Sequence, residues 1–255
     1  MSPARRAGSA PPEALTVDAW YTLLYITPSE HRRILVRRRR LWSAPFLAAG
    51  LSRSRVDALL ARRDAVTLAG EAAGRTPPIR EQVALVARWA GVRVDADEVA
   101  ESLDRGYARS EVRIAPGATG TLRALSDAGV PVALLSNVLH ESGRAARRKL
   151  ADLGLLSEFR AVVLSCEHPW AKPSPELFRL ACRFLEVPPG RAAHLGDLAY
   201  DVGGARSAGM RGWWYIGLSS LNGYLRGQVR PGSVPPEEVV HRWSELPGRL
   251  RVARR

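Results

Sequence analysis

Short apolar runs alternate with helical patterns from residue 118 onward, and this alternation restricts the possible folds more than any other feature of the chain. Short apolar runs predict buried strands, whereas longer segments with apolar residues at helical spacing predict helices. Strands and helices that alternate in this way form a parallel sheet covered on both faces. In chain order we predict helix 118–129, strand 130–136, helix 140–153, strand 161–165, helix 174–186, strand 192–196, helix 198–209 and strand 213–216.

One more strand and a helical block precede this region. The run Ala14–Asp18 predicts a first strand that ends in a carboxylate, and Pro28 with Ser29 provides a turn and a helix N-cap after it. Every segment from there to residue 114 has a helical or loop pattern, and Asp95 begins one of the helices. We therefore predict an α/β fold, a doubly wound parallel sheet with an inserted helical cap domain.

The domain boundaries follow from these patterns. We expect the core to comprise residues 14–27 and 115–255, and the helical cap to comprise residues 28–114. Residues 1–13 are rich in Pro, Ala and Arg and have no apolar periodicity, so we expect a disordered tail there.

The net charge of +13 admits nucleic acid, an anionic membrane face or anionic small molecules as partners. The basic residues are scattered apart from the run 37–40, and no basic motif is interleaved with aromatic residues, so we do not expect a nucleic-acid partner. Nor do we expect a membrane partner, since no apolar run approaches the roughly 20 residues that cross a bilayer. A small anionic substrate is the partner class that remains, and we expect a monomer or homodimer.

Cysteine usage indicates the compartment. The two cysteines, Cys166 and Cys182, have neither metal-ligand spacing nor the pattern of a disulfide framework. We expect both thiols to be free in a reducing environment, and the N-terminus lacks a secretory signal pattern. These features favour a cytoplasmic protein.

Polar residues end three of the predicted strands. Asp18, Ser136 and Asp197 stand at these ends, and open α/β sheets bind ligands where the carboxyl ends of neighbouring strands meet. Since Asp and Ser are also common helix caps, a purely structural role is the alternative for each of them. The sequence therefore predicts a polar site at this edge of the sheet.

Four segments around these strand ends resemble, in order, the four motifs of the haloacid dehalogenase superfamily. They are Asp18-Ala-Trp-Tyr-Thr22-Leu, Leu135-Ser136-Asn137, Lys172-Pro-Ser-Pro and Gly196-Asp197-Leu-Ala-Tyr-Asp201. The resemblance extends over about residues 14 to 250. It implies a hydrolase with a C1-type helical cap that closes over the pocket and carries substrate choice.

The resemblance also assigns roles to these residues. Asp18 would be a carboxylate nucleophile that forms an intermediate which water then hydrolyses. Donors around the transferring group would come from hydroxyl, amide and ammonium groups. The predicted catalytic residues are Asp18, Thr22, Ser136, Asn137 and Lys172, and the predicted substrate-binding residues are Trp20, Ser136, Asn137 and Lys172.

Magnesium is the cofactor that the resemblance implies. Mg²⁺ prefers octahedral oxygen ligands and retains some waters. The predicted metal residues are Asp18, the backbone carbonyl of Trp20, Asp197 and Asp201. Asp197 and Asp201 are four positions apart at a strand-to-helix junction, which favours a common orientation, with Asp201 as the supporting member.

The first motif departs from the pattern of the phosphatases. These enzymes usually have a second Asp, a general acid, two positions after the nucleophile, where this chain has Trp20. Loss of a positioned acid typically lowers rates by about 10²- to 10⁴-fold. The most favoured function is thus a Mg²⁺-dependent phosphatase whose small substrate has a good leaving group or brings its own proton donor.

Two other functions stay open. The dehalogenase branch has an aromatic residue at the position of Trp20, so a 2-haloacid dehalogenase is one alternative, and a weakly catalytic or binding-only protein is the other. His31, His140 and His168 are candidates for a replacement acid. Tyr21 stands where related sequences usually have Gly, which predicts an unusual local backbone.

Overall fold

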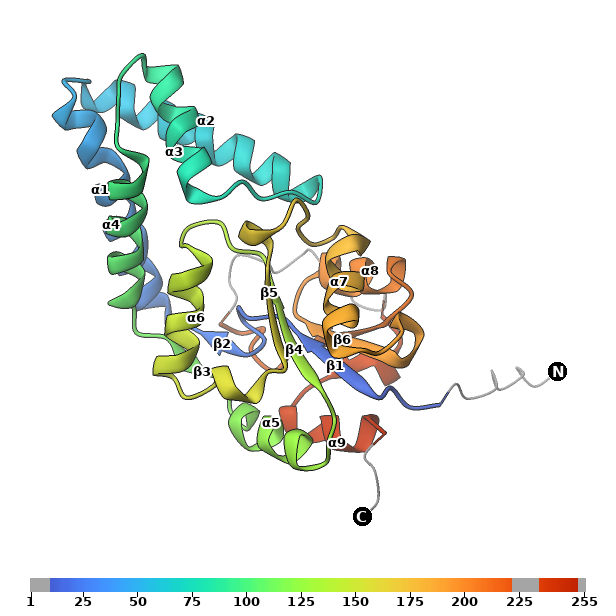
Figure 1. The fold of residues 1–255 in the computed structure, drawn as a ribbon. Coiled ribbons are helices and arrows are strands. Elements are labelled where there is room, and N and C mark those ends of the chain that lie inside the picture. The colour runs from blue at the N-terminus through green and yellow to red at the C-terminus, as the bar shows by residue number, and fades with distance from the viewer. Residues whose placement is uncertain (1–9, 222–233, 252–255) are drawn as a thin grey trace.

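The computed structural model describes residues 10–221 and 234–251. Its centre is a six-stranded, entirely parallel sheet with the strand order β5-β4-β1-β6-β7-β8 (Figure 1). This confirms the α/β fold with a parallel sheet. The strands are β1 (Ala14–Val17), β4 (Val132–Ser136), β5 (Ala161–Leu164), β6 (Ala192–Gly196), β7 (Arg211–Tyr215) and β8 (Val239–Val240).

Helices cover both faces of the sheet because alternate strand residues point in opposite directions. In β4, Val132 and Leu134 join one buried cluster with the helices α5, α6 and α9, whereas Ala133 and Leu135 join a second cluster with α7 and α8. Burial on both faces explains why the strands have continuous apolar runs. The bounds are α5 (Ala118–Asp127), α6 (Gly143–Asp152), α7 (Pro175–Leu185), α8 (Ala199–Ser207) and α9 (Leu246–Arg249).

In the part of the chain that the structure describes, five short 3-10 helices complete the core, at Leu156–Glu158, Ser165–Glu167, Pro189–Arg191, Pro236–Glu238 and Trp243–Glu245. In β7, Trp213 and Tyr215 are buried in the first cluster, whereas Trp214 is partly exposed and points to the opposite face. Among the described residues, no helix combines the length and the apolar content that a membrane crossing requires.

Four helices form the insert between β1 and the rest of the sheet (Figure 1). They pack around a cluster of their own that includes Trp42, Phe46 and Val83. Thr27, not Ser29, caps the first of these helices, because its hydroxyl accepts the Glu30 N–H and Pro28 occupies the first helical turn. The helices are α1 (Pro28–Ala48), α2 (Arg53–Ala72), α3 (Ile79–Ala90) and α4 (Ala96–Ala108).

A small antiparallel sheet joins the two chain crossings between insert and core. It pairs β2 (Leu24–Tyr25) with β3 (Arg113–Ile114). The prediction that residues 29–114 contain no strand is therefore wrong at Arg113–Ile114, and Leu24–Tyr25 was not predicted as a strand. Two-residue strands have no periodicity of their own and form only because the two crossings lie side by side.

The N-terminal boundary also differs from the prediction. Pro12 is buried, its carbonyl accepts the Arg251 N–H at 2.7 Å, and Glu13 pairs with Arg191 and Arg251. These two residues, expected in the tail, are therefore held against the core by partners far away in the sequence. Residues 1–9 of the expected tail lie outside the described residues.

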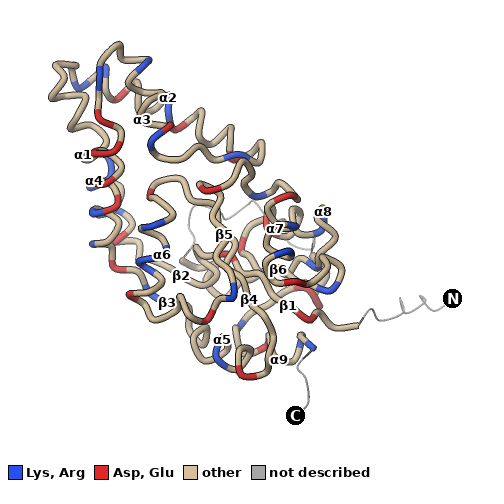
Figure 2. Tube along the Cα trace, viewed as in Figure 1, with Lys and Arg blue, Asp and Glu red and all other residues tan. Residues whose placement is uncertain are grey.

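Charged residues are distributed over the insert and the core. Figure 2 shows basic and acidic positions interspersed along α1 and α4 and around the sheet. Within the basic run, Arg37 and Arg38 line a cavity, whereas Arg39 pairs with Asp57 at 2.7 Å. The side chains of this run thus point in different directions, as expected for consecutive residues of a helix.

Candidate active site

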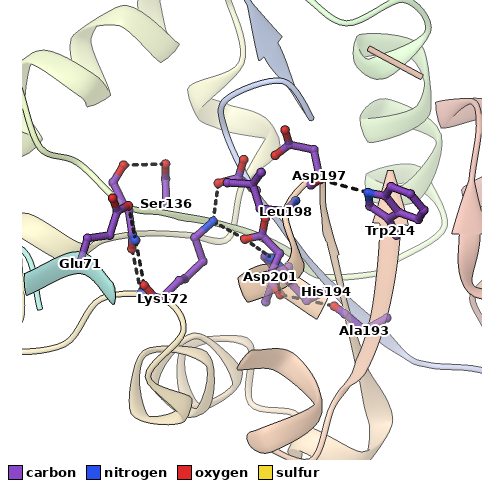
Figure 3. A network of polar contacts seen from close by, with 12 residues as sticks. Glu71, Ser136, Lys172, Ala193, His194, Asp197, Leu198, Asp201 and Trp214 are labelled. Atoms are coloured by element: carbon purple, nitrogen blue, oxygen red, sulfur yellow. Dashed lines mark hydrogen bonds and ion pairs between the residues drawn. The ribbon is translucent and has the colours of Figure 1, made fainter. Parts of the chain in front are cut away.

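The site lies at the carboxyl ends of β4, β1 and β6, which are neighbours in the sheet. Asp18 follows β1, Ser136 ends β4 and Asp197 follows β6. Lys172, from the loop before α7, extends between them (Figure 3). The parallel topology thus brings together residues that are up to 179 positions apart, because parallel strands end at the same edge.

The Lys172 ammonium group connects two carboxylates. Its Nζ is ion-paired with Asp18 Oδ1, and it lies 2.7 Å from Asp201 Oδ1. Lys172 and Asp201 are fully buried, and Asp18 is 6% exposed. A buried ammonium group needs such partners, since an unpaired buried charge is strongly destabilising.

The three charges shift one another's pKa values. Burial disfavours the charged form of Lys172, but the adjacent Asp18 and Asp201 carboxylates outweigh it and raise the Lys172 pKa. Burial also opposes ionisation of Asp201, yet Lys172 and His194 lower the Asp201 pKa below its usual range. For Asp18, burial together with the Asp201 charge outweighs Lys172 and raises the pKa. One ammonium group is therefore too little positive charge for two buried carboxylates.

Asp201 has further partners that fix its position. Its Oδ2 accepts the Leu198 N–H at 3.0 Å, and its Oδ1 lies 3.4 Å from His194 Nε2. The other ring nitrogen of His194 lies 2.8 Å from the Thr16 hydroxyl, and burial lowers the His194 pKa. A Cβ atom at Gly196 would collide with the Asp201 side chain, so this close approach requires glycine.

Three carboxylates form a group that fits a divalent cation. One oxygen atom from each of Asp18, Asp197 and Asp201 lies within 4.8 Å of the others. Carboxylate oxygens are the ligands that Mg²⁺ prefers, and a cation here would compensate the excess negative charge. Asp201 already accepts bonds from the Lys172 ammonium group on Oδ1 and from the Leu198 N–H on Oδ2.

Asn137 holds the backbone of Lys172 in place. Its Oδ1 accepts the Lys172 N–H at 2.8 Å, and its Nδ2 donates to the Lys172 carbonyl at 3.0 Å. The same Nδ2 donates to Glu71 Oε1, at the end of α2, at 2.9 Å (Figure 3). Both amide hydrogens are therefore occupied in this arrangement, and its predicted contact with substrate stays a prediction.

The two predicted hydroxyl groups have different surroundings. Ser136 is 2% exposed and its Oγ donates to the Asn137 carbonyl at 3.3 Å. Thr22 is fully buried, and its Oγ1 has no partner among the described residues, although its carbonyl accepts the Trp243 indole N–H at 3.0 Å. The structure thus places Ser136 beside the site, whereas within residues 10–221 and 234–251 no hydrogen bond links the Thr22 hydroxyl to it.

Trp20 and Tyr21 make the turn after Asp18. The Trp20 ring meets Tyr107 of α4 edge to face, with ring centroids 6.4 Å apart. Tyr21 has a φ of 55°, in the left-handed region that non-glycine residues seldom adopt. The prediction of an unusual backbone at Tyr21 is confirmed.

The structure separates the three candidate histidines. His31 lies in α1 and His140 lines a cavity under the insert; burial and Arg38 lower the pKa of both. His168 follows a 3-10 helix after β5, where its backbone N–H donates to the Ser165 carbonyl. Both cysteines are free, as expected, and burial raises their pKa values.

Three residues near the site were not found from the sequence. Glu71 reaches Asn137 from the insert, His194 supports Asp201 from inside a buried strand, and the Tyr200 ring faces Lys172 Nζ at 5.5 Å. Only His194 had a usable signal, namely a polar residue in an apolar run. The position of Glu71 depends on how the insert packs on the core.

The chain was compared with known proteins. A family model for haloacid dehalogenase-like hydrolases matches residues 12–209. The chain is 35% identical over 188 residues to phosphoserine phosphatase of Thermus thermophilus. The aligned region covers 71% of this chain and 73% of that protein. The chain is 30% identical over 192 residues to the plasmid phosphoglycolate phosphatase of Cupriavidus necator, with 74% and 78% covered.

Solved structures share the fold. A HAD phosphatase from Thermococcus onnurineus superimposes with a TM-score of 0.62 at 22% identity, over 94% of this chain and 99% of that chain. The family model, the sequence relatives and the fold agree with the four motifs at the strand ends. This chain therefore belongs to the haloacid dehalogenase-like hydrolases.

Proposed function

We propose that this hydrolase is a Mg²⁺-dependent phosphatase that acts on a small phosphorylated metabolite through Asp18. The observation that carries the proposal is the fully buried Lys172 ammonium group, which is paired with Asp18 and Asp201 beside a third carboxylate, Asp197. The Lys172 ammonium group and a metal ion held by the neighbouring carboxylates would offset the charge of a dianionic phosphoryl group during its transfer to Asp18.

The residues of the chain have distinct tasks in this reaction. An Asp18 oxygen attacks phosphorus, the bond to the leaving oxygen breaks, and phosphoaspartate forms. Lys172 stabilises negative charge on the phosphoryl oxygens, and Asn137 holds Lys172 in position. Water then attacks phosphoaspartate, which releases inorganic phosphate and restores Asp18.

Asp18, Asp197 and the backbone carbonyl of Trp20 would hold Mg²⁺, with Asp201 as support. When bound, the ion supplies positive charge that neutralises the phosphoryl oxygens. Two further features belong to the proposal. Helices α1 to α4 act as a C1-type cap, and Trp20 replaces the usual acid, so the substrate has a good leaving group or its own proton donor.

The relatives support a phosphatase acting on a small acid. The two relatives described above are named for phosphoserine and phosphoglycolate, both of which combine a phosphate with a carboxylate. The aromatic Trp20 favours a 2-haloacid dehalogenase as a second candidate. A dehalogenase displaces halide without a metal, however, and so gives no reason for Asp197 to lie within 4.8 Å of Asp18 and Asp201.

A screen of phosphorylated metabolites tests the proposal. Native protein with Mg²⁺ should release inorganic phosphate and form a covalent phosphoaspartate that mass spectrometry detects, whereas Asp18→Asn should do neither. Asp152→Asn, which changes an exposed carboxylate of α6, is the matched control and should retain activity. Phosphate release that survives Asp18→Asn would refute the role of Asp18. Metal-independent halide release from a 2-haloacid would establish the second candidate instead.

A further inference from the structure

The second step of the proposed reaction needs a group that accepts a proton. When water attacks phosphoaspartate, its oxygen bonds to phosphorus, the bond from phosphorus to the Asp18 oxygen breaks, and a water proton has to leave. The residue two positions after Asp18 is Trp20, whose indole N–H is a donor only and cannot take this proton. A positioned base from another part of the chain would therefore accelerate the hydrolysis.

Glu71 is a carboxylate that the insert brings to the catalytic group. It lies near the carboxyl end of α2, and its Oε1 accepts the Asn137 Nδ2–H at 2.9 Å (Figure 3). The same Asn137 side chain holds the backbone of Lys172, whose ammonium group is paired with Asp18. Glu71 is thus linked to the nucleophile by two side chains of the predicted site.

The charge of Glu71 also acts on the catalytic group. Burial raises the pKa of Tyr200, and the charges of the site carboxylates add to this shift together with that of Glu71. The Tyr200 ring faces the Lys172 Nζ at 5.5 Å. Glu71 is therefore close enough to influence the same ring as the acidic group of the site.

The segment that follows Glu71 is attached to the core at two points. The Gly74 carbonyl accepts the Ala171 N–H at 2.6 Å, in the loop that carries Lys172. The Thr76 hydroxyl donates to Ser165 Oγ, which in turn accepts the N–H of the residue after Asn137 at 2.9 Å. These contacts fix the end of α2 against both loops of the site.

One oxygen of Glu71 is available for a proton. Within residues 10–221 and 234–251, Glu71 Oε1 bonds to Asn137, and Oε2 has no hydrogen bond or ion pair. The side chain is half-buried, so solvent water can reach it. Figure 3 shows Glu71 on the Ser136 side of Lys172, whereas Asp197 and Asp201 lie on the other side. A phosphoryl group on Asp18 would thus have the acidic group on one side and Glu71 on the other.

We propose that Glu71 is the general base of the second step, an inference that rests on the proposed phosphatase function. Glu71 Oε2 accepts a proton from the water whose oxygen attacks phosphorus. The electron pair of the broken bond returns to the Asp18 carboxylate, hydrogen phosphate leaves, and the proton on Glu71 passes to solvent. Glu71 donates no proton in the first step, so the requirement for a good leaving group is unchanged.

Single-turnover kinetics with p-nitrophenyl phosphate test this inference, because they separate the two steps. With enzyme in excess and Mg²⁺ present, nitrophenolate release reports the formation of phosphoaspartate, and phosphate release reports its hydrolysis. Glu71→Gln keeps an oxygen that accepts the Asn137 N–H but removes the base. It should release nitrophenolate within about twofold of the native rate and release phosphate about 10²- to 10⁴-fold more slowly. Mass spectrometry should then show phosphoaspartate accumulating in the variant.

A shorter carboxylate distinguishes a base from a structural group. Glu71→Asp retains a proton acceptor but loses the reach to Asn137, whereas Glu71→Gln retains the reach and loses the acceptor. A base predicts that Glu71→Asp hydrolyses phosphoaspartate at least about tenfold faster than Glu71→Gln. Glu81→Gln, which changes an exposed carboxylate of α3, is the matched control and should leave both rates unchanged.

The outcomes separate the two proposals. Native phosphate release by Glu71→Gln would overturn the inference, and so would faster release by Glu71→Gln than by Glu71→Asp. Equal losses in both steps would show that Glu71 only positions Asn137 and would overturn it as well. In each of these cases, turnover that depends on Asp18 leaves the phosphatase proposal intact. Native protein that forms no phosphoaspartate would overturn the phosphatase proposal, and this inference with it.

Discussion

In the proposed phosphatase, we expect Trp20 to stand where related enzymes have a proton donor. An indole N–H is a hydrogen-bond donor only and does not exchange a proton with a leaving group near neutral pH. The adjacent Tyr107 is no substitute, because burial and the Glu141 charge raise its pKa and keep its proton in place. At the scale of single residues, we therefore expect the rate of the proposed reaction to depend on how easily the leaving group departs.

We expect Trp20→Asp to raise the rate most for substrates with poor leaving groups. A positioned acid typically contributes about 10²- to 10⁴-fold, so alkyl phosphates should gain up to this factor and acetyl phosphate little. The measurement is log kcat against leaving-group pKa, whose slope should become shallower in the variant. Trp20→Phe, which keeps an aromatic ring without an acid, should retain the native slope. A flat dependence in the native protein would show that another acid already operates.

At the scale of elements, Glu30 connects the two chain crossings. It lies in the first turn of α1, and its Oε1 accepts the Glu111 N–H at 3.1 Å, just before β3. Its Oε2 accepts the Arg33 Nε–H at 2.7 Å. Burial opposes ionisation of Glu30, but these two donors prevail and lower its pKa.

Replacement of Glu30 by Gln should therefore reduce stability in a pH-dependent way. A carboxyl whose pKa is lowered on folding stabilises the protein above its unfolded value of 4.5, and this contribution is lost as pH falls through the lowered pKa. We expect Glu30→Gln to lower the free energy of unfolding by about 1 kcal/mol at pH 7 and by less at pH 3, as measured in urea. A difference that is the same at both pH values would contradict this account.

Gly74 is a second contact between the insert and the core. It follows α2 with a φ of 76°, and its carbonyl accepts the Ala171 N–H at 2.6 Å, next to Lys172. A Cβ atom there would lie 2.9 Å from Ser174 Cβ. Gly91, after α3, has a similar φ of 72° but nothing within 4 Å of such an atom, so it is a matched control.

Gly91→Ala should lower the free energy of unfolding by only about 1 kcal/mol, because alanine is disfavoured in the left-handed backbone conformation. Gly74→Ala should cost at least about 1 kcal/mol more and should also raise KM, because it displaces the loop that carries Lys172. Chemical unfolding and steady-state kinetics of both variants measure the two effects. Equal stability losses and unchanged KM values would show that the close contact of Gly74 with the loop before α7 does not affect function.

At the scale of the whole molecule, we expect the acidic cluster to couple binding of the proposed Mg²⁺ to folding. Asp18, Asp197 and Asp201 come from loops and helices that only the folded chain brings together, so a cation that binds them stabilises the folded state. We expect Mg²⁺ at 100 times its dissociation constant to add about 2.7 kcal/mol and to raise the Tm. Asp197→Asn should abolish the increase, whereas Asp152→Asn should retain it. A Tm that does not respond to Mg²⁺ in the native protein would exclude a metal at this site.

Much of the architecture could be predicted before any coordinates. The strand at Ala192–Gly196 was predicted with its observed bounds, and the helix at Pro175–Leu185 agrees within one residue. These elements have strong apolar patterns, and local pattern is sufficient for them. The two-residue strands Leu24–Tyr25 and Arg113–Ile114 have no such pattern and escaped prediction.

The sequence by itself determined that Asp18, Ser136 and Asp197 meet, because parallel strands in alternation with helices necessarily end at one edge. Only the tertiary structure decided that Lys172 is shared by Asp18 and Asp201, and that Asn137 faces the Lys172 backbone. The physical reason is that strand order follows from local patterns, whereas burial and pairing of a side chain depend on neighbours supplied by distant segments.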